Sequence, residues 1–165
     1  MASPRGRRLY VMRHAQAAAF AASGGGDSDR PLTGHGREQA QAVGRLLAGA
    51  GIERLLVSSA ARARQTAAEL GLAVSPTVIE ALYNCPAGRI ATEVSRLPEY
   101  VTAVLVVGHY PGIPGLVHSL ADPASDRDEL GALARLFPPA TLVELAVGDP
   151  WSQLHRAHLV AVHRP

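Results

Sequence analysis

The sequence predicts an α/β fold, a single domain whose mostly parallel sheet is flanked by helices on both faces, with an antiparallel edge extension near the C-terminus. Short apolar runs alternate with segments of helical spacing up to about residue 120, which is the rhythm of βαβ units. Two further runs flank Gly148-Asp149-Pro150 and predict an antiparallel pair. A chain of 165 residues can bury roughly 70% of its unfolded surface in one core. Residues 1–165 are therefore expected to form one domain.

The first strand is predicted at 9–12, a short apolar run. Residues 16–30 are rich in Ala, Gly, Ser and Asp and predict a flexible loop, which can border a site because it follows a strand end. A helix is predicted over 37–48, where apolar residues recur at helical spacing. Thr33 is its candidate cap, and Gly49 ends it.

The remaining elements follow from apolar spacing and from the Gly and Pro residues between the apolar segments. In order they are a strand at 54–58, a helix at 60–70, a weaker strand at 77–82, a turn at 84–88, a helix at 90–97, a strand at 103–107, helices at 112–120 and 126–135, and strands at 141–147 and 155–162. The run at 103–107 is wholly apolar, which is typical of the centre of a parallel sheet.

The composition indicates a globular protein and excludes several classes of function. Apolar residues make up 47% of the chain and charged residues 18%, which is ample material for a core. All basic residues are Arg, but the formal charge is only +2 and no long basic run occurs, so no nucleic-acid partner is expected. No apolar run approaches a membrane span, and the basic segment Met1 to Arg8 precedes too short an apolar stretch for a signal peptide. Cys85 is the single cysteine, so neither a disulfide nor a cysteine zinc site is expected, and a cytoplasmic location is the default.

Three predicted strands end in residues that suit an anion. Arg13-His14 follows the first strand, Arg62 lies just beyond the second, and Gly108-His109 follows a later one. Ligands of open α/β sheets bind outside the carboxyl ends of the strands, so these side chains can converge on one phosphate. A neutral imidazole can attack phosphorus while arginines stabilise the transferring group. Taken singly, the segments are better explained as a surface pair, an ordinary helix start and a structural histidine.

Together and in this order, the segments resemble the histidine phosphatase superfamily, also called phosphoglycerate mutase-like. Its Arg-His-Gly hallmark is matched by Arg13-His14-Ala15, and its late Gly-His motif by Gly108-His109. Its Ser-x-x-x-Arg-x-x-Gln-Thr segment is matched by residues 58–66, and residues 29–33 are also similar. The resemblance spans about residues 8–120.

The resemblance implies a hydrolase in which His14 is transiently phosphorylated and water then releases phosphate. Arg13, Arg62 and His109 would hold the phosphoryl oxygens in place of a metal ion, so no metal and no other cofactor is expected. Gln16 is a further candidate contact to the phosphate. The histidines outside these motifs are not expected to bind a metal.

One position departs from the family pattern. Many members carry Leu-x-Glu-x-x-x-Gly, whose Glu protonates the leaving alkoxide, and in the corresponding stretch, 82–88, Asn84 stands in the place of the acid. An amide cannot donate that proton, so without a substitute acid the cleavage of a phosphate ester should be slower by about 10²- to 10⁴-fold. Glu80 is a candidate substitute acid, but it can equally be an exposed strand residue.

A phosphohistidine substrate avoids this difficulty, because its ring, protonated on the other nitrogen, leaves as neutral imidazole. Short connections around an open pocket would admit a histidine on a protein surface, and the chain is similar in size and motif spacing to the SixA-type phosphohistidine phosphatases. We therefore expect a phosphatase that acts on phosphohistidine in a protein. The alternatives are a small-molecule phosphomonoesterase and, from another class, a catalytically silent module that binds phosphorylated proteins. The oligomeric state is left open.

Overall fold

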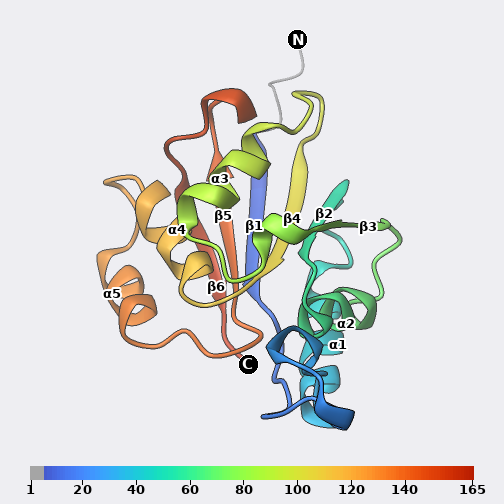
Figure 1. Ribbon diagram of the computed structural model, residues 1–165. Helices are drawn as coiled ribbons and strands as arrows, with labels where there is room; N and C mark the ends of the chain where they lie inside the picture. Colours follow the sequence, from blue (N-terminus) through green and yellow to red (C-terminus); the bar gives the residue numbers. More distant parts are fainter. Residues whose placement is uncertain (1–5) are drawn as a thin grey trace.

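The computed structural model describes residues 6–165 and confirms the predicted fold class (Figure 1). Residues 1–5, the start of the basic segment for which no signal peptide is expected, lie outside the described residues. The strands are β1 (Arg7–Arg13), β2 (Arg54–Ser58), β3 (Pro76–Ile79), β4 (Ala103–Gly108), β5 (Leu142–Val147) and β6 (His158–His163). The α-helices are α1 (Gly34–Leu47), α2 (Ala61–Glu69), α3 (Ala87–Ser95), α4 (Gly112–Leu120) and α5 (Arg127–Arg135). Short 3₁₀ helices are η1 (Ala22–Gly24), η2 (Asp27–Asp29), η3 (Glu80–Leu82) and η4 (Trp151–Gln153).

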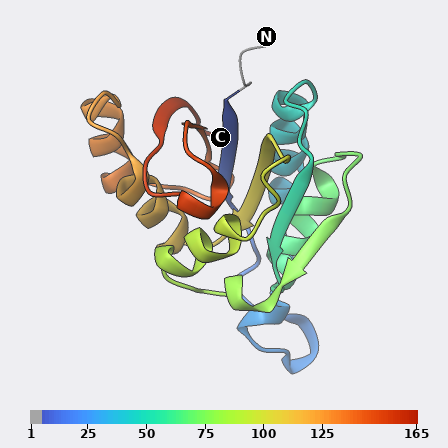
Figure 2. The same cartoon turned by 90° about the horizontal axis from the view of Figure 1, so that it is seen from above.

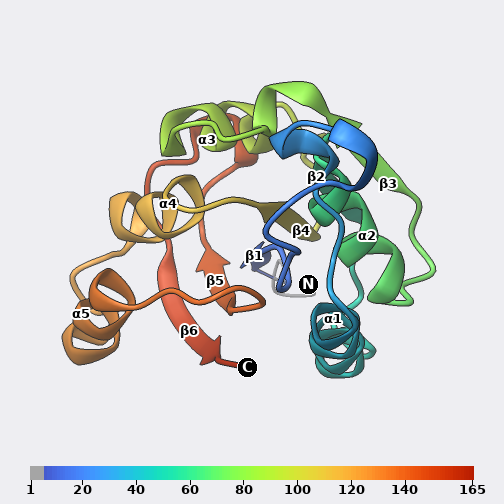
Figure 3. The same cartoon turned by 60° about the horizontal axis from the view of Figure 1, so that its bottom comes forward.

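The six strands form one sheet in the order β3-β2-β4-β1-β5-β6. The first four strands of the chain pair with one another in parallel, whereas β5 pairs antiparallel with β1 and β6 antiparallel with β5. Figure 2 and Figure 3 show α1 and α2 on one side of the sheet and α3 and α4 on the other. The predicted parallel sheet with an antiparallel edge near the C-terminus is therefore present.

The register of the sheet brings two of the predicted motifs together. Arg13 at the end of β1 pairs with Gly108 at the end of β4. The backbone N–H of His14 continues this pairing and donates to the carbonyl of Gly108 at 2.9 Å. His14 and His109 therefore leave the sheet side by side, because each is the next residue after a paired position.

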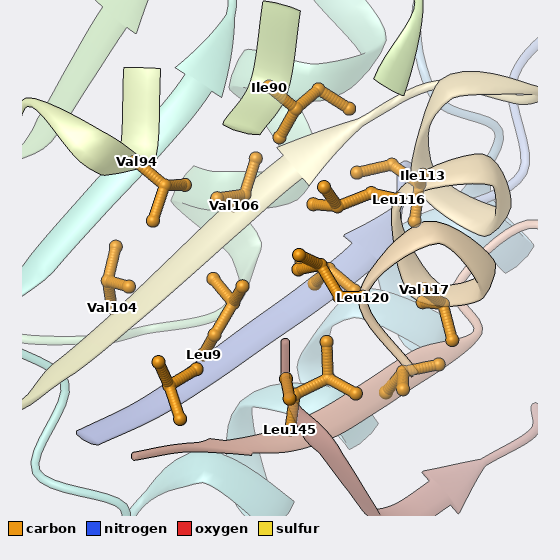
Figure 4. Packing of buried hydrophobic residues seen from close by; sticks show 14 of the residues in the cluster. Leu9, Ile90, Val94, Val104, Val106, Ile113, Leu116, Val117, Leu120 and Leu145 are labelled. Atoms are coloured by element: carbon orange, nitrogen blue, oxygen red, sulfur yellow. The ribbon is translucent and has the colours of Figure 1, made fainter. Parts of the chain in front are cut away.

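The core is divided by the sheet into two clusters. Successive side chains of a strand point to opposite faces, so Leu9 of β1 belongs to one cluster and Tyr10 to the other. The first cluster also contains residues of α3, α4 and α5, and the second contains residues of α1 and α2. Figure 4 shows the first cluster, in which Leu9, Val104 and Val106 of the sheet face side chains of α3 and α4.

Some predicted boundaries are wrong. The strand predicted at 77–82 ends at Ile79, because the next three residues turn into η3 and bury Leu82 in the core. The helix predicted from residue 90 begins at Ala87. The last strand begins at His158 rather than at 155, because η4 and the residues after it lie outside the ladder.

The predicted N-cap of the first helix is confirmed. The hydroxyl oxygen of Thr33 accepts a hydrogen bond from the backbone N–H of Gly36 at 3.0 Å, so α1 begins at Gly34, earlier than the apolar pattern indicates. Gly36 itself allows a close contact, because a Cβ there would lie 2.1 Å from the carbonyl oxygen of Gln16. This contact packs the start of α1 against the loop that follows β1.

Candidate active site

A pocket of about 230 Å³ lies at the carboxyl ends of β1 and β4, next to the start of α2. Its walls come from these strand ends, from the loop before α1 and from the segment after η3. The lining residues are Arg13, His14, Asp27, Arg30, Arg62, Asn84, His109 and Tyr110. In Figure 3 the blue loop between β1 and α1 lies on this side of the molecule. The structure thus brings the three predicted strand-end motifs to one pocket.

His14 is buried and held in one orientation. Its ring Nδ1 lies 2.7 Å from the carbonyl oxygen of Ala15. A carbonyl oxygen only accepts, so Nδ1 carries the ring proton and Nε2 keeps its lone pair. In agreement, Nε of Arg62 donates to Nε2 of His14 at 3.3 Å. The ring nitrogen nearest to Arg62 is therefore the one that can act as a nucleophile.

The surroundings of His14 keep its ring uncharged. Burial is the main cause, and the charge of Arg62 adds to it; together they lower the pKa of His14 to about 4. The hydrogen bond to Ala15 acts in the opposite direction but does not cancel them. At neutral pH the imidazole is neutral, which nucleophilic attack requires.

His109 lies next to His14, with the ring centroids 5.3 Å apart. Its Nε2 is 2.7 Å from the hydroxyl oxygen of Ser58, whereas its Nδ1 is buried without a hydrogen-bond partner among residues 6–165. When Ser58 donates to Nε2, Nδ1 carries the proton and is suited to a ligand oxygen. Burial, and then the neighbouring His14, lower the pKa of His109 to about 3.

Arg13 lines the pocket, and only part of its guanidinium group is hydrogen-bonded. Its Nη1 donates to the carbonyl of Phe137 at 2.8 Å, and its guanidinium lies over the ring of Tyr110 at 5.4 Å. Its Nε is buried and has no hydrogen-bond partner in the described part of the chain. Buried donors of this kind normally have a partner, so an anion in the pocket is a fitting one.

Arg62 lies in the first turn of α2 and only 3% of its side chain is exposed. Besides its bond to His14, its Nη1 donates to the backbone carbonyl of Asp27 at 2.8 Å and its Nη2 to the Asp27 carboxylate at 3.1 Å. These bonds fix the guanidinium plane while leaving N–H groups for an anion.

The other positions of the Ser-x-x-x-Arg-x-x-Gln-Thr segment hold neighbouring loops in place. The side-chain oxygen of Gln65 accepts from the backbone N–H of Leu32 at 2.8 Å. The hydroxyl oxygen of Thr66 accepts from the backbone N–H of Ala15 at 3.0 Å, and its O–H donates to the carbonyl of Arg62 at 2.7 Å. The spacing of the motif therefore ties α2 both to the residue after His14 and to the loop before α1.

Two predicted site residues lie outside the lining of the pocket. The side-chain oxygen of Gln16 accepts from the hydroxyl of Thr33 at 2.7 Å. Glu80 is exposed at the start of η3. Asn84, by contrast, lines the pocket with a φ of 47°, a conformation that Asn adopts more readily than most residues. The pocket therefore has an amide where the family pattern has an acid.

Four residues at or beside the pocket were not identified as site residues from the sequence: Asp27, Arg30, Tyr83 and Tyr110. The first two lie in the loop that was expected to border a site, and polar residues after a Gly-rich stretch at a strand end are the available signal. Tyr83 donates from its hydroxyl to the carboxylate of Asp27, and no local pattern predicts that contact.

Two further findings apply to residues 6–165. No helix there combines the length and the apolar character that crossing a membrane requires. No group of three or more His, Cys, Asp or Glu side chains there is arranged to hold a metal ion.

Comparison with known proteins agrees with this geometry. The family model of the histidine phosphatase superfamily (branch 1) matches residues 9–113. Phosphohistidine phosphatase SixA of Escherichia coli (strain K12) is 38% identical over 121 residues, which cover 68% of this chain and 73% of that protein.

Two solved structures show the same relationship. A candidate phosphohistidine phosphatase SixA from Nakamurella multipartitia is 35% identical with a TM-score of 0.86, covering 97% of this chain and 96% of that chain. A protein histidine phosphatase SixA complexed with tungstate is 29% identical with a TM-score of 0.75, covering 94% of this chain and 95% of that chain. The chain therefore belongs to branch 1 of the histidine phosphatase superfamily and is a SixA-like phosphatase.

Proposed function

We propose that this phosphatase removes phosphoryl groups from phosphohistidine in a protein, by way of a phosphohistidine formed on its own His14. The observation that supports this most is the composition of the pocket. It combines a neutral imidazole with several N–H groups that can donate hydrogen bonds to a phosphate, and it has Asn84 where an acid would protonate the leaving group. A similar SixA forms a complex with tungstate, a tetrahedral oxyanion like phosphate, which supports an oxyanion in this pocket.

In the first step, the lone pair of His14 Nε2 forms a bond to phosphorus as the substrate's P–N bond breaks. The electron pair of that bond returns to the substrate nitrogen. Because the other substrate nitrogen already carries a proton, the ring leaves as neutral imidazole. The positive charge passes to the ring of His14, where the carbonyl of Ala15 accepts from Nδ1–H. Arg13, Arg62 and His109 bind the phosphoryl oxygens.

In the second step, water attacks phosphorus and the bond to Nε2 of His14 breaks. The electron pair returns to Nε2, and both protons of the water remain on the released dihydrogen phosphate. His14 regains its neutral ring, so no additional proton donor is needed in either step. Because neither step needs a further proton donor, a phosphohistidine substrate is compatible with an amide at position 84.

A phosphate ester would need a proton on its leaving oxygen. Glu80, the candidate substitute, is exposed and does not line the pocket. We therefore expect kcat/KM for a phosphohistidine-containing protein to exceed that for small alkyl phosphate esters by at least about 100-fold. Parallel assays of phosphate release test this, and faster turnover of several esters would favour the phosphomonoesterase alternative.

The covalent intermediate distinguishes catalysis from silent binding. Brief incubation with a ³²P-labelled phosphohistidine protein, followed by alkaline quenching, should leave an acid-labile label on the wild-type chain. His14→Ala should carry no label and show no turnover, while its far-UV circular dichroism remains that of the wild type. A wild-type chain that shows neither label nor turnover would contradict catalysis and leave the phosphoprotein-binding module as the alternative. The proposal includes a cytoplasmic location, for which the lone cysteine is the supporting feature.

A further inference from the structure

Asp27 places a carboxylate in the same pocket as Asn84, the position where the family pattern has its acid. Asp27 opens η2 and lines the pocket, with 49% of its side chain exposed. One of its carboxylate oxygens accepts from the hydroxyl of Tyr83, the residue just before Asn84. The carboxylate and the amide of Asn84 thus line the same pocket, and Tyr83 links the segments that carry them.

The carboxylate is surrounded by donors that hold it in the charged form. Oδ2 accepts from Tyr83 and from Nη2 of Arg62, and Oδ1 accepts from Nε of Arg30 at 3.0 Å. The Tyr83 hydroxyl has the largest effect, and with the two arginines it holds the pKa of Asp27 far below the ordinary range. Asp27 therefore has no proton to give to an alkoxide at neutral pH.

A charged carboxylate can still accept a hydrogen bond from a leaving group. Each carboxylate oxygen accepts more than one bond, and Oδ1 has a single partner, Arg30, among the described side chains. We propose that Asp27 accepts the ring N–H of the substrate's phosphohistidine, so that this nitrogen keeps its proton and the ring leaves as neutral imidazole. This inference rests on the proposed function, because it names how the same pocket selects its substrate.

The proposed contact would favour phosphoramidates over esters. A phosphohistidine ring enters with a positive charge and an N–H, both of which a carboxylate stabilises. An ester leaves with negative charge developing on its oxygen, which the same carboxylate destabilises. The carboxylate of Asp27 would thus hold the substrate ring as the carbonyl of Ala15 holds the ring of His14.

Asp27→Asn tests this role, because it keeps the shape of the side chain and removes the charge. We expect kcat/KM for a phosphohistidine protein to fall by about 10- to 100-fold, the loss of one charge-assisted hydrogen bond. For p-nitrophenyl phosphate, whose leaving oxygen departs with the negative charge that the carboxylate opposes, we expect kcat/KM not to fall and to rise by less than about threefold. The readout is the ratio of the two kcat/KM values.

A role confined to positioning Arg62 predicts a different result. Arg62 serves the phosphoryl group of both substrates, so its displacement would lower both kcat/KM values by the same factor and leave the ratio unchanged. That outcome would overturn the inference. Faster ester turnover by the wild-type chain would instead contradict the proposed function, so the two failures are distinguishable.

Asp29→Asn is the matched control. Asp29 lies in the same 3₁₀ turn, and its carboxylate accepts from the backbone N–H of Gly26 at 3.0 Å, but it does not line the pocket. The ratio should remain within about twofold of the wild-type value in this variant, well below the loss of a charge-assisted bond. An equal change of the ratio in Asp27→Asn and Asp29→Asn would assign the effect to the loop as a whole and refute a specific contact by Asp27.

Discussion

At the scale of single residues, the two pocket histidines owe their chemistry to oriented partners. The carbonyl of Ala15 holds the ring proton of His14 on Nδ1, so that Nε2 keeps its lone pair. When the hydroxyl of Ser58 donates to Nε2 of His109, Nδ1 of that ring carries the proton. Burial then keeps both rings neutral until the pH is well below 7. The same burial that permits nucleophilic attack makes protonation of these rings costly for the fold.

We therefore expect a measurable loss of stability in mild acid. The pKa of His14 is about 4 in the folded protein, below the ordinary value of 6.5, so between these values the unfolded chain binds more protons. Stability must fall as the pH drops through that window. From pH 7.5 to pH 5, His14 should account for about 2 kcal/mol of the loss in the free energy of unfolding.

Urea unfolding of wild type and His14→Gln at the two pH values measures this contribution. The variant should lose about 2 kcal/mol less than the wild type. His118→Gln, which replaces an exposed histidine of α4, is the control and should keep the wild-type loss. Equal losses in wild type and His14→Gln would show that His14 does not resist protonation in the fold.

Ser58 is expected to act through His109. Ser58→Ala removes the partner 2.7 Å from Nε2, so the ring is no longer held in the tautomer that presents Nδ1–H to the phosphoryl group. We expect kcat for a phosphohistidine protein to fall by about 10-fold, the effect of weakening one transition-state donor. The free energy of unfolding should fall by about 1–3 kcal/mol, because Nε2 becomes an unsatisfied buried atom.

Steady-state kinetics and urea unfolding of Ser58→Ala test both expectations. The matched control is Ser59→Ala, which changes the next residue, half-buried rather than buried. It should leave kcat within about twofold of the wild-type value, since it removes no hydrogen bond to His109. A Ser58→Ala variant with wild-type kcat would contradict the assigned tautomer of His109.

At the scale of secondary-structure elements, the site was predictable wherever strand ends alone position it. Arg13-His14 and Gly108-His109 each end an apolar run, and the parallel register of β1 and β4 makes them neighbours. The position of Arg62 was also predictable, because it lies in the first turn of the helix after β2. Local apolar patterns suffice for these positions, since the sheet supplies the long-range geometry.

The part of the site that was not predicted depends on contacts between loops. Asp27 meets Tyr83 across 56 positions of the sequence, and neither lies on a strand or an α-helix. Residues 80–82 read as a continuation of a strand, but burial of Leu82 turns them into η3. Such contacts are set by tertiary packing rather than by spacing along the chain, so periodicity does not reveal them.

The packing of α1 on the end of α2 gives an element-scale prediction. A Cβ at Gly44 would lie 2.0 Å from the carbonyl oxygen of Leu70, the C-cap of α2. Gly44→Ala should therefore lower the free energy of unfolding by at least about 2 kcal/mol, although Ala is the better helix former. Thermal and urea unfolding measure the change.

Gly131→Ala in α5 separates helix propensity from packing. The nearest atom to its added Cβ is the far end of the Arg135 side chain, at 3.5 Å. This substitution should raise the free energy of unfolding by about 0.5–1 kcal/mol, so the two Gly→Ala variants should differ in sign. Stabilisation by both would mean that α1 and α2 pack less closely than the structure indicates.

At the scale of the whole molecule, the sheet is common to both core clusters. Alternate residues of β1 and of β4 enter opposite clusters, so neither cluster can lose its packing without disturbing strands that the other needs. The carboxyl ends of these same strands carry the pocket. The expectation that residues 1–165 form one domain thus becomes a prediction about cooperativity.

The single tryptophan makes this prediction measurable. Trp151 is fully buried in the cluster of α3, α4 and α5, whereas Leu55 of β2 is 1% exposed in the cluster on the other side of the sheet. Leu55→Ala should lower the free energy of unfolding by about 2–5 kcal/mol. In one cooperative domain, the free energies of unfolding measured by tryptophan fluorescence and by far-UV circular dichroism should both fall by that amount. Leu46→Ala, at a site 55% exposed on α1, should shift neither by more than about 0.5 kcal/mol. The contrary result is an unfolding transition of Leu55→Ala that is unchanged by Trp151 fluorescence but shifted by circular dichroism. It would show that the chain unfolds as two units.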